Sequence, residues 1–162
     1  DSTVKKIECG YKHCVFLTNN GNVYGYIHTK DRYRMGLPLN YNENKPEIQN
    51  IINTQNIIDI GCCYQSTFML DNKNMLQGYG HNISKEIHIK YDKPNITTLS
   101  VADFKCGFRH FGLITKTGKL YMNGWNADWQ CGIKNKHNSN EFCNFNEINI
   151  NDKIIDVKCG WE

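Results

Sequence analysis

The chain has 162 residues, of which 40% are hydrophobic, 12% aromatic and 22% charged. This composition predicts a globular chain with a modest apolar core. No apolar run approaches the ~18 residues of a membrane-spanning helix, so we expect no membrane span. The formal net charge of +3 is small and the lysines and arginines are dispersed among acidic residues, which argues against direct binding of nucleic acid.

The first predicted elements are two short strands joined by a tight turn. "CVFLT" at residues 14–18 and "VYGYI" at 23–27 are rich in strand-forming residues and flank Asn20-Gly21. Glycine supplies the positive φ that a tight reversal requires, so this pattern predicts a β-hairpin. A further strand is expected upstream, in "TVKKIE", and another downstream, in "PEIQNII".

The same order of elements returns along the chain. "CGYKH", which begins at Cys9, is followed by the related segments "CCYQS" at Cys62, "CGFRH" at Cys106 and "CGWE" at Cys159. Strand-like pieces precede the later copies ("NIIDIG", "SVADFK", "KIIDVK"), and "EIHIKY" and "FNEINI" are candidates for a last strand. Such periodicity indicates supersecondary units that complete one another's core.

These units predict an all-β fold, a β-propeller of four-stranded antiparallel blades. About three blades and the start of a fourth are expected over residues 1–162, with repeats starting near residues 4, 57, 101 and 154. Closed propellers have typically 4–8 blades. We therefore expect the chain to be part of a longer protein.

The register of the repeats resembles the regulator of chromosome condensation family, whose pattern runs roughly Val-x-Cys-Gly-x-x-His-Thr-x-Ala-Leu-Thr-x-x-Gly-x-Val-Tyr-x-Trp-Gly-x-Asn-x-x-Gly-Gln-Leu-Gly. The matching residues of the third repeat are Cys106, Gly107, His110, Thr115, Gly118, Tyr121, Gly124, Asn126, Gln130 and Gly132. Those of the first repeat are Cys9, Gly10, His13, Leu17, Thr18, Gly21, Val23, Tyr24 and Gly36, and Cys159-Gly160 begin a fourth copy. The resemblance implies a seven-bladed propeller, of which this chain is a divergent, partial member.

The chain departs from the family pattern at several of its glycine places and at its tryptophan place. Ile27, Tyr33 and Trp129 stand where the family has glycine, and Asn123 stands where it has tryptophan. The second repeat lacks the Gly-Gln-Leu-Gly tail.

The recurring cysteines are open to two interpretations. A small, soft side chain at one repeat position fits tight packing between modules, whereas Cys-x3-His, at Cys9 and again at Cys106, admits a zinc hypothesis. The second copy has Ser66 at the histidine place and no Cys-x2-Cys pair completes a tetrahedral set, so we expect no metal and no cofactor. Residues a whole repeat apart are expected to sit in neighbouring modules and need not meet.

Other cysteines have no assigned role, and the redox state of Cys62, Cys63, Cys131 and Cys143 stays open. If the cysteines are reduced, the nucleus or the cytoplasm is the expected compartment.

The histidines are predicted to be structural. His13 and His110 are expected to hydrogen-bond backbone within their blade, because a buried ring with two polar nitrogens needs such partners. Gly107, Gly118 and Gly124 are expected to shape turns. No paired carboxylates, nucleophile with a recurring base, or phosphate-binding loop is found, so no catalytic residues are predicted.

Function is expected in the surface loops, because a propeller is a scaffold. Two loops combine aromatic and basic side chains of the kind that dominates interfaces, and the predicted partner-binding residues are Arg32, Tyr33, Arg34, Trp129, Lys134, Lys136 and His137. The alternative is that the aromatic residues fill blade edges while the lysines are solvated.

The family resemblance implies protein partners: a small GTPase, histones or the subunits of a complex. The first hypothesis is a protein-interaction propeller with guanine-nucleotide exchange on a Ran-type small GTPase as its candidate activity, which requires no covalent chemistry. The alternative is a non-catalytic architectural or recognition subunit of a larger assembly, such as a ubiquitin ligase.

Overall fold

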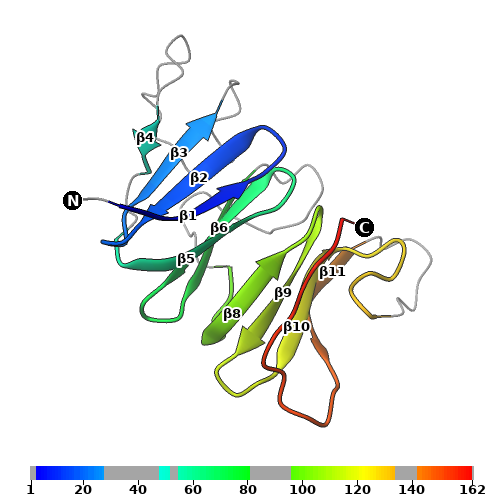
Figure 1. Ribbon diagram of the computed structural model, residues 1–162. Coiled ribbons are helices and arrows are strands. Elements are labelled where there is room, and N and C mark those ends of the chain that lie inside the picture. Colours follow the sequence, from blue (N-terminus) through cyan, green and yellow to red (C-terminus); the bar gives the residue numbers. More distant parts are fainter. Residues whose placement is uncertain (1–2, 28–47, 52–54, 81–95, 134–141, 162) are drawn as a thin grey trace.

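The computed structural model describes residues 3–27, 48–51, 55–80, 96–133 and 142–161, and the structural statements below concern these residues. They form three antiparallel sheets that stand side by side (Figure 1). Among them, no helix is long and apolar enough to cross a bilayer. The prediction of an all-β, propeller-like arrangement of about three blades is confirmed.

Each sheet follows the chain order of its strands. The first sheet contains β1 (Val4–Cys9), β2 (His13–Thr18), β3 (Val23–Ile27) and β4 (Gln49–Asn50). The second contains β5 (Ile57–Cys62), β6 (Ser66–Asp71) and β7 (Leu76–Gly80). The third contains β8 (Val101–Cys106), β9 (His110–Thr115), β10 (Leu120–Trp125) and β11 (Phe142–Ile148).

The predicted last strands have different outcomes. "PEIQNII" contains β4, and "FNEINI" overlaps the end of β11, which begins earlier, at Phe142. "EIHIKY", at residues 86–91, lies outside the described residues.

The hairpin turns contain residues with positive φ. Gly21 and Gly118 have φ values of 80° and 82°, and Asn74 takes the same place in the second sheet with φ of 64°. At that turn the Asp71 carboxylate accepts hydrogen bonds from the N–H groups of Lys73 and Met75, both at 2.9 Å. The side-chain bonds hold a turn that lacks glycine.

The same three turns connect successive repeats. The N–H of Ile57 donates to the carbonyl of Gly21, that of Val101 to Asn74, and that of Ile154 to Gly118, at 2.9–3.2 Å. Each repeat therefore starts at a fixed point on the hairpin of the repeat before it.

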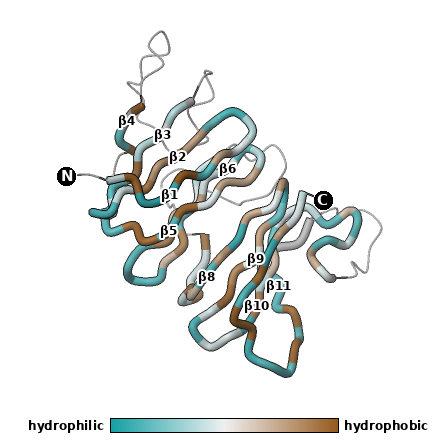
Figure 2. The backbone as a smooth tube through the Cα atoms, viewed as in Figure 1, coloured by the Kyte–Doolittle hydropathy of each residue, from teal (hydrophilic) through white to brown (hydrophobic). Residues whose placement is uncertain are grey.

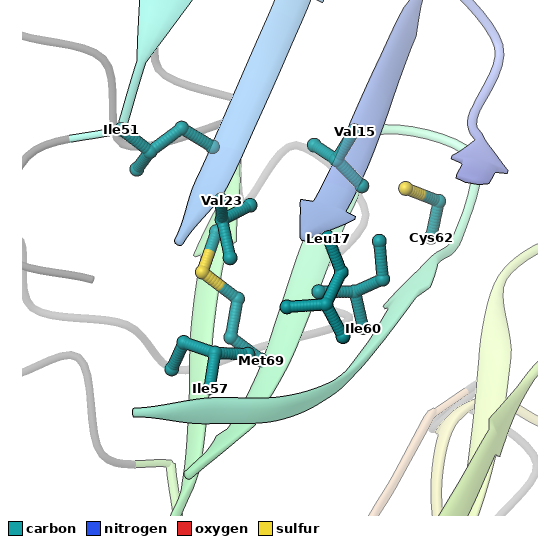
Figure 3. Close-up of a cluster of buried hydrophobic side chains, with 8 residues drawn as sticks. All are labelled: Val15, Leu17, Val23, Ile51, Ile57, Ile60, Cys62 and Met69. Carbon is teal, nitrogen blue, oxygen red and sulfur yellow. The ribbon is translucent and has the colours of Figure 1, made fainter. Parts of the chain in front are cut away.

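The core lies between the sheets. Figure 3 shows Val15 and Leu17 of β2 and Val23 of β3 gathered with Ile60 of β5 and Met69 of β6. The second and third sheets enclose a similar cluster, which contains Phe68, Leu70, Leu76, Val101, Phe104, Phe111 and Leu113. Figure 2 shows apolar segments along the strands of all three sheets, with hydrophilic residues at the hairpin turns. One sheet alone has no such enclosed core, so neighbouring repeats stabilise each other.

Residues 149–161 continue past the third sheet. The Cys159 thiol donates to the carbonyl of Lys105 in β8 at 3.3 Å, and the chain runs back along the third sheet to the C-terminal end (Figure 1). A fourth copy of the cysteine motif thus lies beside the third.

Candidate functional site

One groove is lined by the same three-residue segment from all four repeats. It has a volume of about 550 Å³, and its lining consists of Cys9-Gly10-Tyr11, Cys62-Cys63-Tyr64, Cys106-Gly107-Phe108 and Cys159-Gly160-Trp161. We call this the triplet groove. The first three triplets each begin at the last residue of the first strand of their repeat, and β5 contacts both β1 and β8. The expectation that residues one repeat apart need not meet is therefore wrong for these positions.

The third residue of every triplet is aromatic, and the four rings form a continuous row. Neighbouring ring centroids are 4.6 Å apart for Tyr11 and Tyr64, 4.5 Å for Tyr64 and Phe108, and 4.1 Å for Phe108 and Trp161. The N–H of Tyr11 donates to the carbonyl of Tyr64 at 3.0 Å, and that of Tyr64 donates to Phe108 at 2.7 Å. Backbone bonds between repeats therefore position this row, which we call the aromatic ladder.

Two cations lie on the aromatic ladder. Lys12 Nζ is 5.4 Å from the centroid of Tyr11. The Arg109 guanidinium carbon is 5.4 Å from both Tyr64 and Phe108 and 5.6 Å from Trp125. These are cation–π distances. Within the described parts of the chain, no carboxylate forms an ion pair with either cation.

Beneath the ladder, two of the repeats pack a histidine ring against a glycine. A Cβ atom at Gly10 would collide with the His13 ring and lie 2.8 Å from the carbonyl oxygen of Cys63. At Gly107 it would lie 2.8 Å from the His110 ring and 2.6 Å from the carbonyl oxygen of Gly160. Glycine is required here because a ring and the backbone of the next repeat occupy the space.

The second repeat changes both members of this pair. Cys63 replaces the glycine and Ser66 replaces the histidine, and both side chains are buried. The larger residue at the first position is accompanied by a smaller one at the second, and the triplet keeps its place in the groove.

Both histidines are buried, and one has a ring partner in the next sheet. His13 Nε2 shares a hydrogen bond of 3.0 Å with the Thr67 hydroxyl, which belongs to that sheet. This bond links two sheets, and the expected backbone partners within each blade stay a prediction. His110 is also buried, and burial lowers its pKa, so its ring is neutral at neutral pH.

Three cysteines of the groove, Cys62, Cys106 and Cys159, are protonated thiols. Burial raises the pKa of Cys62 and of Cys106 well above the usual range, and raises that of Cys159 to about 11. A thiol is a poor nucleophile and a poor metal ligand. Across the described residues, no group of three His, Cys, Asp or Glu side chains could hold a metal ion.

No cysteine with a described side chain forms a disulfide. The seven with described side chains are free thiols: Cys9, Cys14, Cys62, Cys63, Cys106, Cys131 and Cys159. The side chain of Cys143 lies outside the described residues.

Of the residues predicted to bind a partner, Trp129 is described, and it does not line the triplet groove. It is 60% exposed and has φ of 63°, at a place where the family pattern has glycine. Its turn is fixed by Asn126, whose side-chain oxygen accepts the N–H of Cys131 and whose amide donates to the carbonyl of Ile133, both at 2.9 Å. Six predicted residues lie outside the described residues: Arg32, Tyr33, Arg34, Lys134, Lys136 and His137.

The aromatic ladder was missed by the sequence prediction. Its signal was the aromatic residue two places after each recurring cysteine, which is Tyr, Tyr, Phe and Trp in the four copies.

Comparison with known proteins agrees with this geometry. The profile of the Regulator of chromosome condensation (RCC1) repeat matches residues 4–26, and the same cysteine register recurs in the second, third and fourth copies. The first repeat of this chain matches the RCC1 repeat, and the described sheets have an RCC1-like fold. The match covers β1, β2 and most of β3.

Individual relatives share the RCC1-like architecture. The ultraviolet-B receptor UVR8 of Arabidopsis thaliana is 24% identical over 169 residues, which cover 98% of this chain and 37% of the receptor. Yeast RCC1 (Prp20) bound to Kap60 superposes on 99% of this chain and 40% of its own, with a TM-score of 0.75 at 16% identity. Human WBSCR16 superposes with a TM-score of 0.70 at 16% identity, over 99% of this chain and 43% of its own. The chain thus spans about two fifths of the length of these relatives.

Proposed function

We propose that this RCC1-like propeller segment recognises a protein partner through the triplet groove. The observation that carries the proposal is the aromatic ladder, whose end residues Tyr11 and Trp161 are 58% and 69% exposed. Tyr, Trp and Arg are the residues most enriched at interface hot spots. The ladder and the adjacent Arg109 supply all three types on a backbone held by bonds between repeats.

The finer form of this proposal concerns the partner and the activity. Saccharomyces cerevisiae Prp20p, a structural relative, is described by its binding to Gsp1p and to histones. We carry over a Ran-type small GTPase and histones as candidate partners, with nucleotide exchange as the activity to test. Exchange requires a surface that stabilises the nucleotide-free GTPase and no covalent step. The alternative is an architectural or recognition subunit that binds without changing nucleotide release.

The compartment belongs to the same proposal. We place the protein in the nucleus or the cytoplasm, where buried free thiols stay reduced.

The experiment compares the full-length protein with Phe108→Ser, which removes one inner ring of the ladder, and with Lys116→Gln. Lys116 is exposed at the hairpin end of the same sheet, away from the groove. Binding to a Ran-type GTPase and to core histones is measured, together with the rate of nucleotide release. Equal melting temperatures and circular dichroism spectra establish that each variant is folded.

We expect binding to weaken at least about tenfold in Phe108→Ser, since truncated hot spots typically cost that much, and to stay unchanged in Lys116→Gln. Equal binding by Phe108→Ser and wild type would contradict recognition through the groove. If excess wild-type protein binds the GTPase but leaves its nucleotide release unchanged, the exchange activity is wrong and the recognition role stands.

A further inference from the structure

The first repeat has a second cysteine directly opposite its recurring one. Cys14 of β2 faces Cys9 of β1 in the antiparallel register, and the two Sγ atoms are 3.0 Å apart. The residue at the place of Cys14 is Thr67 in the second sheet and Phe111 in the third, and the family pattern has threonine there. Among the described sheets, a facing pair of thiols is therefore particular to the first.

The backbone places the two thiols where a disulfide bond can form. Just beyond them, the N–H of Gly10 donates to the carbonyl of His13 at 2.9 Å. Antiparallel ladders alternate between hydrogen-bonded and non-hydrogen-bonded pairs, so Cys9 and Cys14 form a non-hydrogen-bonded pair, whose Cα atoms are typically about 4.5 Å apart. This spacing lies within the range of disulfide-bonded cysteines, so side-chain rotation can bring the sulfurs to bonding distance.

The two thiols differ in exposure, which assigns their roles. Cys9 is exposed, whereas Cys14 is partly buried. Burial and the hydrogen bond with Cys9 raise the pKa of Cys14 to about 11. Cys14 therefore keeps its proton, and Cys9 is the sulfur that an oxidant in solution reaches first.

From this geometry we propose that Cys9 and Cys14 are a reversible oxidation site, which a hydroperoxide converts into a cross-strand disulfide within the chain. The Cys9 thiolate attacks a peroxide oxygen, the O–O bond breaks, and Cys9 becomes a sulfenic acid as hydroxide leaves. The Cys14 sulfur then attacks the Cys9 sulfur, so that the S–S bond forms, the S–O bond breaks, and the departing hydroxide takes the Cys14 proton. With hydrogen peroxide, the two thiols give up two electrons and two protons, and two water molecules are released.

The bond is reversible by thiol–disulfide exchange. A thiolate of a reduced dithiol attacks one sulfur of the pair, and a second exchange releases both cysteines as thiols while the dithiol becomes the disulfide. Disulfides in reducing compartments are usually transient and redox-sensing. This behaviour agrees with the free thiols of the described cysteines and with the nucleus or cytoplasm as the proposed compartment.

Zinc binding is the other use of paired thiols, and the surroundings do not favour it. A structural zinc site takes four ligands in a tetrahedral arrangement. In the part of the chain that the structure describes, no group of three His, Cys, Asp or Glu side chains could hold a metal ion. The pair is therefore better suited to oxidation than to zinc.

The test exposes the reduced full-length protein to hydrogen peroxide, blocks the remaining thiols with N-ethylmaleimide, and maps all cysteines by mass spectrometry after digestion with trypsin. Trypsin cleaves after Lys12, between the two cysteines, so the disulfide appears as two cross-linked peptides. Half of each oxidised sample is treated with dithiothreitol before it is blocked.

Two variants separate the roles of the thiols. Cys14→Thr is the matched variant, because the second sheet has threonine at this place, and Cys9→Ser removes the exposed thiol. Equal circular dichroism spectra and melting temperatures before oxidation establish that both are folded. The other cysteines in the same digest are the internal control.

In wild type, we expect Cys9 and Cys14 to lose the N-ethylmaleimide label together and their cross-linked peptides to be the most abundant cysteine pair. Dithiothreitol should restore both labels. In Cys14→Thr, Cys9 should proceed to sulfinic and sulfonic acids, which dithiothreitol does not reverse, because the second thiol is missing. In Cys9→Ser, Cys14 should keep its label, because the attacking thiol is missing.

Any of three results would overturn the inference. In the first, Cys9 and Cys14 of the wild type keep their labels in peroxide. In the second, Cys9 of the wild type proceeds to sulfinic acid as it does in Cys14→Thr. In the third, the disulfide joins Cys9 to a different cysteine of the same or another molecule. None of these results bears on binding through the triplet groove, which Phe108→Ser tests separately.

Discussion

The second repeat reaches the same backbone as the first and third repeats with different side chains. Beneath the ladder, Gly10 and Gly107 are each covered by a histidine ring, whereas the second repeat has Cys63 and the smaller Ser66 at these two places. The turn bond is the same in all three: the N–H of the triplet's second residue donates to the carbonyl three places on, at 2.8–2.9 Å. The comparison teaches that the groove is preserved by paired exchange, in which volume added at one position is removed at the other.

The largest loss of stability is expected when the glycine beneath the ladder is replaced while its histidine is kept. Gly107→Ala places a Cβ 2.6 Å from the carbonyl oxygen of Gly160, which as backbone cannot swing aside. We expect it to lower the free energy of unfolding by about 3 kcal/mol, the upper range of overpacking, as measured by urea denaturation. Cys63→Ala, at the equivalent position, is the control and should cost about 1 kcal/mol. Equal losses in the two variants would show that glycine is not required there.

The second prediction concerns stability after a ring is added at the histidine place of the second repeat, with and without removal of the side chain at the glycine place. Ser66→His places a ring against Cys63 and should cost about 2 kcal/mol by overpacking. Adding Cys63→Gly should recover part of this loss. We expect recovery to be incomplete. The His13 ring bonds the hydroxyl of Thr67 in the next sheet, but the corresponding residue in the third sheet is Phe111. The new ring at position 66 therefore has no such hydroxyl to bond. Strictly additive losses in a double-mutant cycle would contradict paired exchange.

Much of this architecture could be predicted from the sequence. Recurring cysteines and turn glycines indicated the hairpins, because strand periodicity and positive φ are local properties. The aromatic ladder could not be predicted in the same way. Tyr64 and Phe108 are 44 residues apart, and their contact depends on how first strands of neighbouring sheets converge. The hydroxyl of Thr67 as partner of His13 depends on the same convergence.

The third prediction concerns a glycine place of the family pattern that holds a large side chain in this chain. Trp129 stands at a glycine place of the family pattern with φ of 63°, a conformation that costs a residue with a side chain about 1 kcal/mol. Because the side chain is largely exposed, Trp129→Gly should raise the free energy of unfolding by up to about 1 kcal/mol, measured by thermal and urea denaturation. A clear loss of stability would mean that contacts of the indole outweigh the backbone strain.

The smallest expected effect is a pH dependence of stability, which His110 contributes and which Ser66, at the same place in the second repeat, does not. Burial holds the pKa of His110 below its ordinary value, so as pH falls below about 6.5 the unfolded chain takes up a proton that the folded chain resists. Stability is therefore fully present above that pH and decreases between pH 7 and the lowered folded pKa. His110→Gln should flatten this part of the stability profile, whereas Ser66→Ala should not. An unchanged slope in His110→Gln would contradict a buried neutral ring.

The account's central claim is that the four triplets form one recognition surface for a protein partner. The most direct measurement replaces Tyr64 with the photo-crosslinking residue p-benzoylphenylalanine in the full-length protein and identifies crosslinked peptides by mass spectrometry. The same residue at Lys116 serves as the control. We expect Tyr64 to crosslink to a segment of a protein partner, with Phe108→Ser reducing the yield and position 116 giving no such product. Crosslinks at position 116 without any at Tyr64, or a Tyr64 yield that Phe108→Ser leaves unchanged, would contradict the claim.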